Sequence, residues 1–109
     1  MPDFDKLWKD LKEQITHLAK DTVEENWQAA VQDGKDIVDK NEAKLQKWLT
    51  MLNEGQLDKE EFEFLCGGLK NLAEMEALRQ AGLKAGQIDK FRTQLFALII
   101  DAGFKFVMV

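Results

Sequence analysis

The chain has 109 residues, of which 45% are hydrophobic and 32% are charged, and this balance excludes both a disordered segment and a typical membrane protein. Acidic residues outnumber basic residues by 20 to 15, which gives a net charge of -5 and argues against nucleic-acid binding. A single domain over residues 1–109, with one hydrophobic core, is therefore expected.

Few residues in the chain interrupt helices. Short strands and hairpins need turn-forming and strand-forming residues, but the chain has only seven glycines, one proline and no tyrosine. The composition therefore predicts an all-α fold. The first residues lack the basic and apolar segments of a secretory signal, and the single cysteine, Cys66, cannot form an intramolecular disulfide. A cytoplasmic location is expected on these grounds.

Apolar residues recur at helical spacing from Phe4 to Leu52 and predict a long amphipathic helix over residues 3–53. The apolar stripe moves about 120° around the helix along this segment, which indicates a repeat slightly longer than 3.6 residues. A continuous helix of this kind would be about 75 Å long, far longer than a compact domain of this size.

Two shorter helices are the alternative for this segment. Asp21 and Glu24 have the spacing of a capping box, and the dipeptide Asp33-Gly34 is a turn signal. Either feature could end one helix and start another. The absence of proline and the small penalty of an isolated glycine favour continuity.

A second helix is predicted over residues 58–81. Asp58 is a good N-cap, and Glu61 follows three residues later to complete a capping box. The helix is apolar on two sides, which is typical of a helix sandwiched between other segments or subunits. One face holds Phe62, Leu65, Leu69 and Leu72, and the nearly opposite face holds Phe64, Met75 and Leu78.

A third helix is predicted over residues 89–108 and is the most apolar part of the chain. Gly86 to Lys90 repeats the pattern of Gly55 to Lys59, which indicates that the same stop-and-cap device precedes this helix. Asp101 and Lys105 have the spacing of a salt bridge within a narrow polar stripe. The apolar residues around the rest of the helix require cover; they include Leu95, Phe96, Ile99, Ile100, Phe104 and Phe106.

The residues that most enzymes and metal sites need are scarce. The chain contains no serine and only one histidine, His17, which excludes a nucleophilic triad, a usual zinc site and a di-iron bundle. Glu60, Glu61 and Glu63 lie at a helix N-terminus, where negative charge is favourable without a metal. No enzymatic activity, cofactor or metal is expected.

The segment Cys66-Gly67-Gly68 is unusual inside a helix. We interpret it as small residues beside a tight helix crossing, with a reactive thiol or close backbone contact with a partner as the alternative. No basic neighbour in the sequence would lower the pKa of the thiol.

These patterns predict a long antiparallel helical hairpin or an up-down bundle of about three helices, assembled into a homo-oligomer. The predicted function is non-enzymatic self-assembly or protein interaction through amphipathic helices, with a second copy or another helix as partner. The apolar residues named above for the second and third helices are the candidate contact residues.

The alternative function is membrane or lipid binding through residues 95–109. This segment is short of the roughly 20 residues needed to cross a bilayer and carries Asp101 and Lys105, so the alternative is the less favoured one.

Overall fold

A computed structural model describes residues 3–107, which are almost entirely helical and contain no strand. The all-α fold is therefore confirmed. The helices are α1 (Phe4–Val23), α2 (Trp27–Asn53), α3 (Lys59–Leu72), α4 (Glu76–Gln80) and α5 (Ala85–Val107), with a short 3-10 turn, η1 (Glu24–Asn26), between the first two. The last residue of the predicted helix 89–108 and the end of the segment 95–109 lie outside the described residues.

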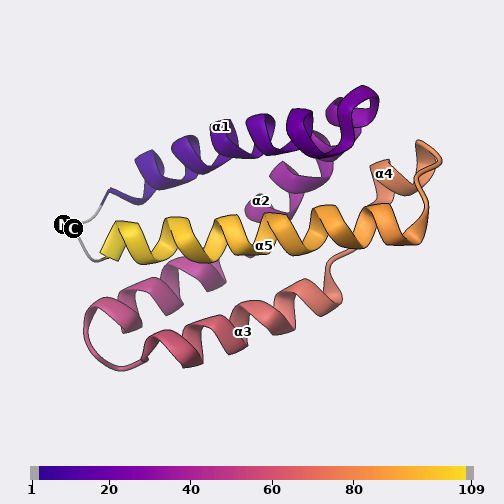
Figure 1. Cartoon of the computed structure of the whole chain (residues 1–109). Helices are drawn as coiled ribbons and strands as arrows, with labels where there is room; N and C mark the ends of the chain where they lie inside the picture. The colour runs from indigo at the N-terminus through magenta and orange to yellow at the C-terminus, as the bar shows by residue number, and fades with distance from the viewer. Residues whose placement is uncertain (1–2, 108–109) are drawn as a thin grey trace.

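The helices form an up-down bundle around α5 (Figure 1). In this view α5 runs between α1 and α3, antiparallel to both, while α2 passes behind it. The start of α1 meets the end of α5, where the Phe4 and Phe106 rings are 5.0 Å apart. The bundle measures 43 × 24 × 20 Å with a radius of gyration of 13.8 Å, so it is compact rather than an elongated hairpin.

The predicted helix 3–53 contains two helices instead of one. The chain reverses at η1, where Glu24 adopts a φ of 46°, and α2 then packs back against α1. The drift of the apolar stripe explains this break, because one straight helix could not have turned both ends of the stripe toward the same core. After the reversal, Ile15 of α1 and Leu45 of α2 are both fully buried.

Of the two predicted break points, the segment from Asp21 to Glu24 is where the chain turns, although no capping box forms there, and Asp33-Gly34 is not a break. Asp21 lies within the last turn of α1, and Asp33 and Gly34 lie inside α2. A Cβ atom added to Gly34 would approach Ile15 Cγ2 to 2.7 Å, so this glycine permits α1 and α2 to pack closely. Gly103 of α5 has the same role, because an added Cβ would lie 2.9 Å from Leu49 Cδ2.

The predicted helix 58–81 is also divided, into α3 and α4. The residues between them include Ala73, whose backbone is extended with ψ of 124°. This interruption turns the second apolar face inward, and Met75 and Leu78 are fully buried in the same core as Phe62. The two-sided pattern therefore comes from a change of direction rather than from a sandwiched helix.

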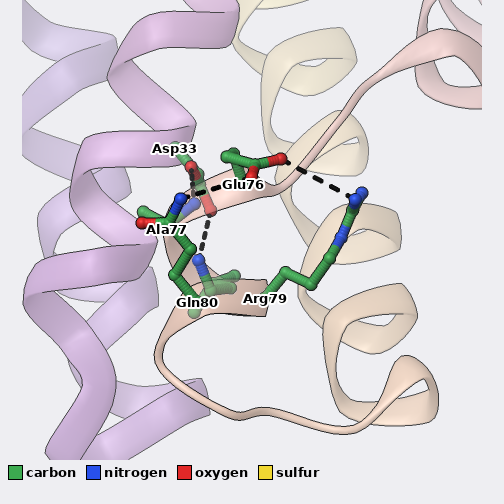
Figure 2. Close-up of polar contacts among 6 residues, drawn as sticks. Asp33, Glu76, Ala77, Arg79 and Gln80 are labelled. Atoms are coloured by element: carbon green, nitrogen blue, oxygen red, sulfur yellow. Dashed lines mark hydrogen bonds and ion pairs between the residues drawn. The ribbon is translucent and has the colours of Figure 1, made fainter.

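Asp33 holds the start of α4 in place (Figure 2). Its buried carboxylate, only 4% exposed, accepts hydrogen bonds from the backbone N–H groups of Ala77 at 2.9 Å and Leu78 at 2.8 Å. No side chain near the start of α4 caps this helix. A carboxylate from α2 thus supplies the acceptor that the first turn of α4 lacks.

The predicted capping box of Asp58 is confirmed, but its repeat at Asp89 is not. Asp58 accepts from the N–H of Glu61 at 2.7 Å, and Glu61 accepts from the N–H of Asp58 at 3.1 Å. Asp89, in contrast, lies inside α5, which begins at Ala85. Gln87 accepts from the N–H of Lys84 at 3.1 Å, so Gln87 rather than Asp89 supplies the capping hydrogen bond at the start of α5.

Candidate interaction surface

Most of the predicted contact residues lie in the core of this chain. The buried ones are Phe62, Leu69, Met75, Leu78, Leu95, Phe96 and Ile99, and the partly buried ones are Leu65, Ile100, Phe104 and Phe106. The apolar surface of α5 is covered by α1, α2 and α3 of the same chain. The argument that another subunit must cover α5 is therefore wrong.

Phe64 and Leu72 are the exception. Their side chains are 82% and 79% exposed, and no other large apolar side chain in residues 3–107 is exposed to this degree. They are eight positions and about 80° apart on α3, with Gly68 halfway between. Leu72, which was predicted to share the face of the buried Phe62, is therefore exposed beside Phe64 instead. We call the side defined by Phe64, Gly68 and Leu72 the outer face of α3.

The position of Phe64 explains why this face stays uncovered. In the predicted helix 58–81, Phe64 shares its side with Met75 and Leu78. The interruption between α3 and α4 turns the latter two inward, whereas Phe64 precedes it and remains on the outside. α3 contacts α5 and α2 through its opposite side, from which Phe62 packs its ring 5.7 Å from that of Phe104.

Gly67 and Gly68 lie at the middle of α3 without any packing reason inside this chain. A Cβ atom added to either would meet no atom within 4 Å, in contrast to Gly34 and Gly103. Each glycine destabilises a helix interior by about 0.5–1 kcal/mol relative to alanine. The expected tight helix crossing is therefore at Gly34 and Gly103 instead.

The charges around the outer face are acidic. Glu60, Glu61 and Glu63 are exposed on α3, and none of the ion pairs found in the described part of the chain includes them. Both lysines of α3, Lys59 and Lys70, lie more than about 100° around the helix from Phe64. The Nζ atom of Lys59 lies instead 5.5 Å from the centre of the Phe104 ring.

A shallow hollow of about 420 Å³ adjoins the face at the N-terminal end of α3. Its lining residues are Leu57, Glu60, Glu61, Phe64 and Leu65. The hollow thus combines three apolar side chains with two carboxylates. An apolar side chain flanked by a cation would match both.

Cys66 lies beneath the outer face and is not exposed. Burial, with a further contribution from the negative charge of Glu63, raises the pKa of its thiol to about 12. The thiol is therefore protonated at neutral pH and is a poor nucleophile. This agrees with the interpretation of Cys66 as a small buried residue.

The remaining features that bear on chemistry are few. His17 is exposed on α1, and no cluster of three His, Cys, Asp or Glu side chains in residues 3–107 has an arrangement that could hold a metal ion. Two other hollows, of about 370 and 390 Å³, are lined by neither His17 nor Cys66. Within the same range, no helix has the length and apolarity to cross a bilayer.

Two structural roles were not predicted from the sequence. Asp33 caps a helix 44 residues away in the chain, and no local pattern marks it for this role. Gly34 and Gly103 allow close helix contact. The sequence feature that could have identified them is a small residue within an otherwise apolar stripe.

Comparison with known proteins adds no relative: no family model, no curated protein and no solved structure matches the chain.

Proposed function

We propose that the chain is a non-enzymatic interaction module that binds by packing of amphipathic helices, and that the outer face of α3 is its contact surface. The observation that carries this proposal is the exposure of Phe64 and Leu72 on one side of α3. Single exposed apolar residues are ordinary on protein surfaces, whereas two large ones on one helix side, next to a hollow lined by further apolar side chains, give a partner more apolar area to cover.

Packing energetics support the same surface. Burying a Phe or Leu side chain is worth about 1.5–3 kcal/mol each, so a partner that covers both gains a substantial part of a micromolar affinity. Gly67 and Gly68 leave space for the backbone of a partner helix to come close, because no atom of this chain occupies it. The helical groove between Phe64 and Leu72 suits an apolar side chain of that partner.

Self-association through this face stays a prediction, as does binding of a helix from another protein. Both would bury the same two side chains. The alternative of lipid binding through residues 95–109 has less support, because Leu95, Phe96 and Ile99 are buried in the bundle and would have to leave it.

Two measurements test the proposal. Sedimentation of the intact chain over a range of concentrations detects self-association, and fluorescence anisotropy detects binding of labelled amphipathic model helices. We expect at least one of these to show a defined complex. The double variant Phe64→Ser/Leu72→Ser should weaken that complex by tenfold or more, on the order of the lost apolar burial.

The matched control is Ala97→Ser/Thr93→Ser, which alters two exposed positions of α5 and should leave the complex unchanged. Circular dichroism of each variant checks that the helices are retained. A chain that remains monomeric and binds none of the model helices would contradict the proposal, as would a complex that tolerates both serines.

A further inference from the structure

We infer that the partner of the outer face of α3 is a basic amphipathic helix rather than a second copy of this chain. This inference rests on the proposed function, since it names the occupant of the same surface. It combines the apolar pair, Phe64 and Leu72, with the charges that border it.

Negative charge borders the face at its N-terminal end. With 100° between successive residues, Glu60 and Glu61 lie about 40° and 60° from Phe64, on opposite sides of it. Both are exposed, and Glu61 also accepts the N–H of Asp58 in the capping box. A partner helix on Phe64 therefore brings its own flanking residues against these two carboxylates.

No cation of α3 neutralises the carboxylates of Glu60 and Glu61. Lys70 lies about 120° around the helix from Phe64, and Lys59 is directed toward the Phe104 ring. Basic side chains must come from the partner. Complementary charges at the rim of an interface speed association and select the partner, whereas like charges oppose it.

A second copy of the chain meets this requirement poorly. In a parallel pair of α3 helices, Glu60 and Glu61 would face the same residues of the other copy. In an antiparallel pair centred on Gly68, they would lie beyond the end of the other α3, beside the α3–α4 junction that carries the exposed Glu74 and Glu76. Both arrangements place carboxylates together, and the net charge of -5 adds to the repulsion.

The dimensions of the face define the partner further. The outer face extends about 12 Å from Phe64 to Leu72, slightly more than two helical turns, and the adjoining hollow continues this surface toward Leu57. The matching helix has apolar residues at i, i+3, i+4 and i+7, with Lys or Arg beside them. Its basic flank would lie over the N-terminal half of α3, and its apolar residues would cover Phe64 and Leu72.

The test uses three labelled model helices of about 18 residues that share one leucine face and differ only in their flanking residues. The flanks are all Lys, all Gln or all Glu. We expect the full chain to bind the Lys helix about tenfold more tightly than the Gln helix, and the Glu helix most weakly. This preference should shrink as salt is raised from about 0.05 to 0.5 M, because salt screens exposed charges.

Matched variants separate local charge from net charge. Glu60→Gln/Glu61→Gln should weaken binding of the Lys helix about three- to tenfold, and Gln at position 61 can still close the capping box. The control Glu13→Gln/Glu25→Gln changes the net charge equally at exposed positions of α1 and η1 and should change affinity less than about twofold.

The outcomes distinguish the inference from the proposed function. Binding that requires Phe64 and Leu72 but is equal for all three helices would overturn the basic partner and leave the interaction surface standing. A dimer that is lost in Phe64→Ser/Leu72→Ser would do the same. Equal losses in the two glutamine pairs would also overturn it, because the attraction would then come from net charge alone.

Discussion

Asp33 shows how one residue can hold two distant segments together. The buried carboxylate satisfies two backbone N–H groups at the start of α4, and the neighbouring Glu76–Arg79 and Glu76–Gln80 contacts of α4 are on the surface (Figure 2). Hydrogen bonds to a charged group contribute more than neutral ones, and a buried donor without an acceptor is unfavourable. The junction between α3 and α4 therefore depends on this side chain.

Replacement of Asp33 by alanine should lower the free energy of unfolding by about 2–3 kcal/mol, since it leaves two donors without an acceptor. Asp33→Asn should lower it less, because the amide oxygen still accepts one bond. Urea denaturation followed by circular dichroism measures both. Asp36→Ala, an exposed position of the same helix, should change stability by less than about 0.5 kcal/mol.

Cys66 makes stability depend on alkaline pH. Its thiol titrates near its ordinary pKa in the unfolded chain, whereas burial raises the pKa to about 12 in the folded chain. Between about pH 9 and 12 the unfolded state therefore loses this proton while the folded state keeps it. The contribution to stability is full below pH 9 and is lost as the pH rises toward 12.

The difference between wild type and Cys66→Ala isolates this effect from the titration of lysines. The wild type should lose stability relative to the variant by at most about 1.4 kcal/mol per pH unit above pH 9, as measured by urea denaturation at each pH. A difference that stays constant from pH 8 to about 11 would show that the thiol ionises equally in both states.

At the scale of the helices, two kinds of glycine have opposite roles. Gly34 lies inside α2 where a methyl group would collide with Ile15, whereas Gly68 lies inside α3 with open space around it. Helix propensity alone would favour alanine at both positions. The packing around each position decides whether helix propensity or steric collision dominates the change in stability.

We expect Gly68→Ala to raise the free energy of unfolding by about 0.5–1 kcal/mol. Gly34→Ala should lower it by about 1–2 kcal/mol, because over-packing of the core exceeds the gain in helix propensity. Thermal and urea unfolding measure both changes. A loss of stability in Gly68→Ala would mean that α3 is packed more closely than the structure shows.

At the scale of the whole molecule, α5 and α3 differ in position. α5 lies at the centre of the bundle, whereas α3 lies at its edge and has one exposed side. Ile99 of α5 is 3% exposed, whereas Phe64 of α3 is 82% exposed. Both positions read as apolar contact residues in the sequence. Only their places in the bundle distinguish them.

The substitution Ile99→Asp should unfold the chain, since an unpaired buried carboxylate is unfavourable by about 4 kcal/mol or more and small domains have only about 5–15 kcal/mol of stability. Phe64→Asp should leave the helical circular dichroism spectrum and the unfolding midpoint nearly unchanged. Loss of helix in Phe64→Asp would show that this side chain belongs to the core.

Local patterns in the sequence determined the helical class, the capping box at Asp58 and the Asp101–Lys105 ion pair, which is 3.0 Å long in the structure. These features depend on residues three or four positions apart, so their physics is present in any short segment. The interpretation of Cys66 as a small buried residue also came from its neighbours in the sequence.

Only the tertiary structure decided where the long helical segments break and which apolar face remains outside. Ala73 carries no proline or glycine signal, and the sequence marked Glu24 only through a capping box that does not form. The chain turns at both places because separate apolar stripes reach one core only after it turns. Asp33 then fixes α4 through contacts across 44 residues. Because the periodicity of a helix records which residues share a side but not what covers that side, the exposure of Phe64 and Leu72 could be read only from the assembled bundle.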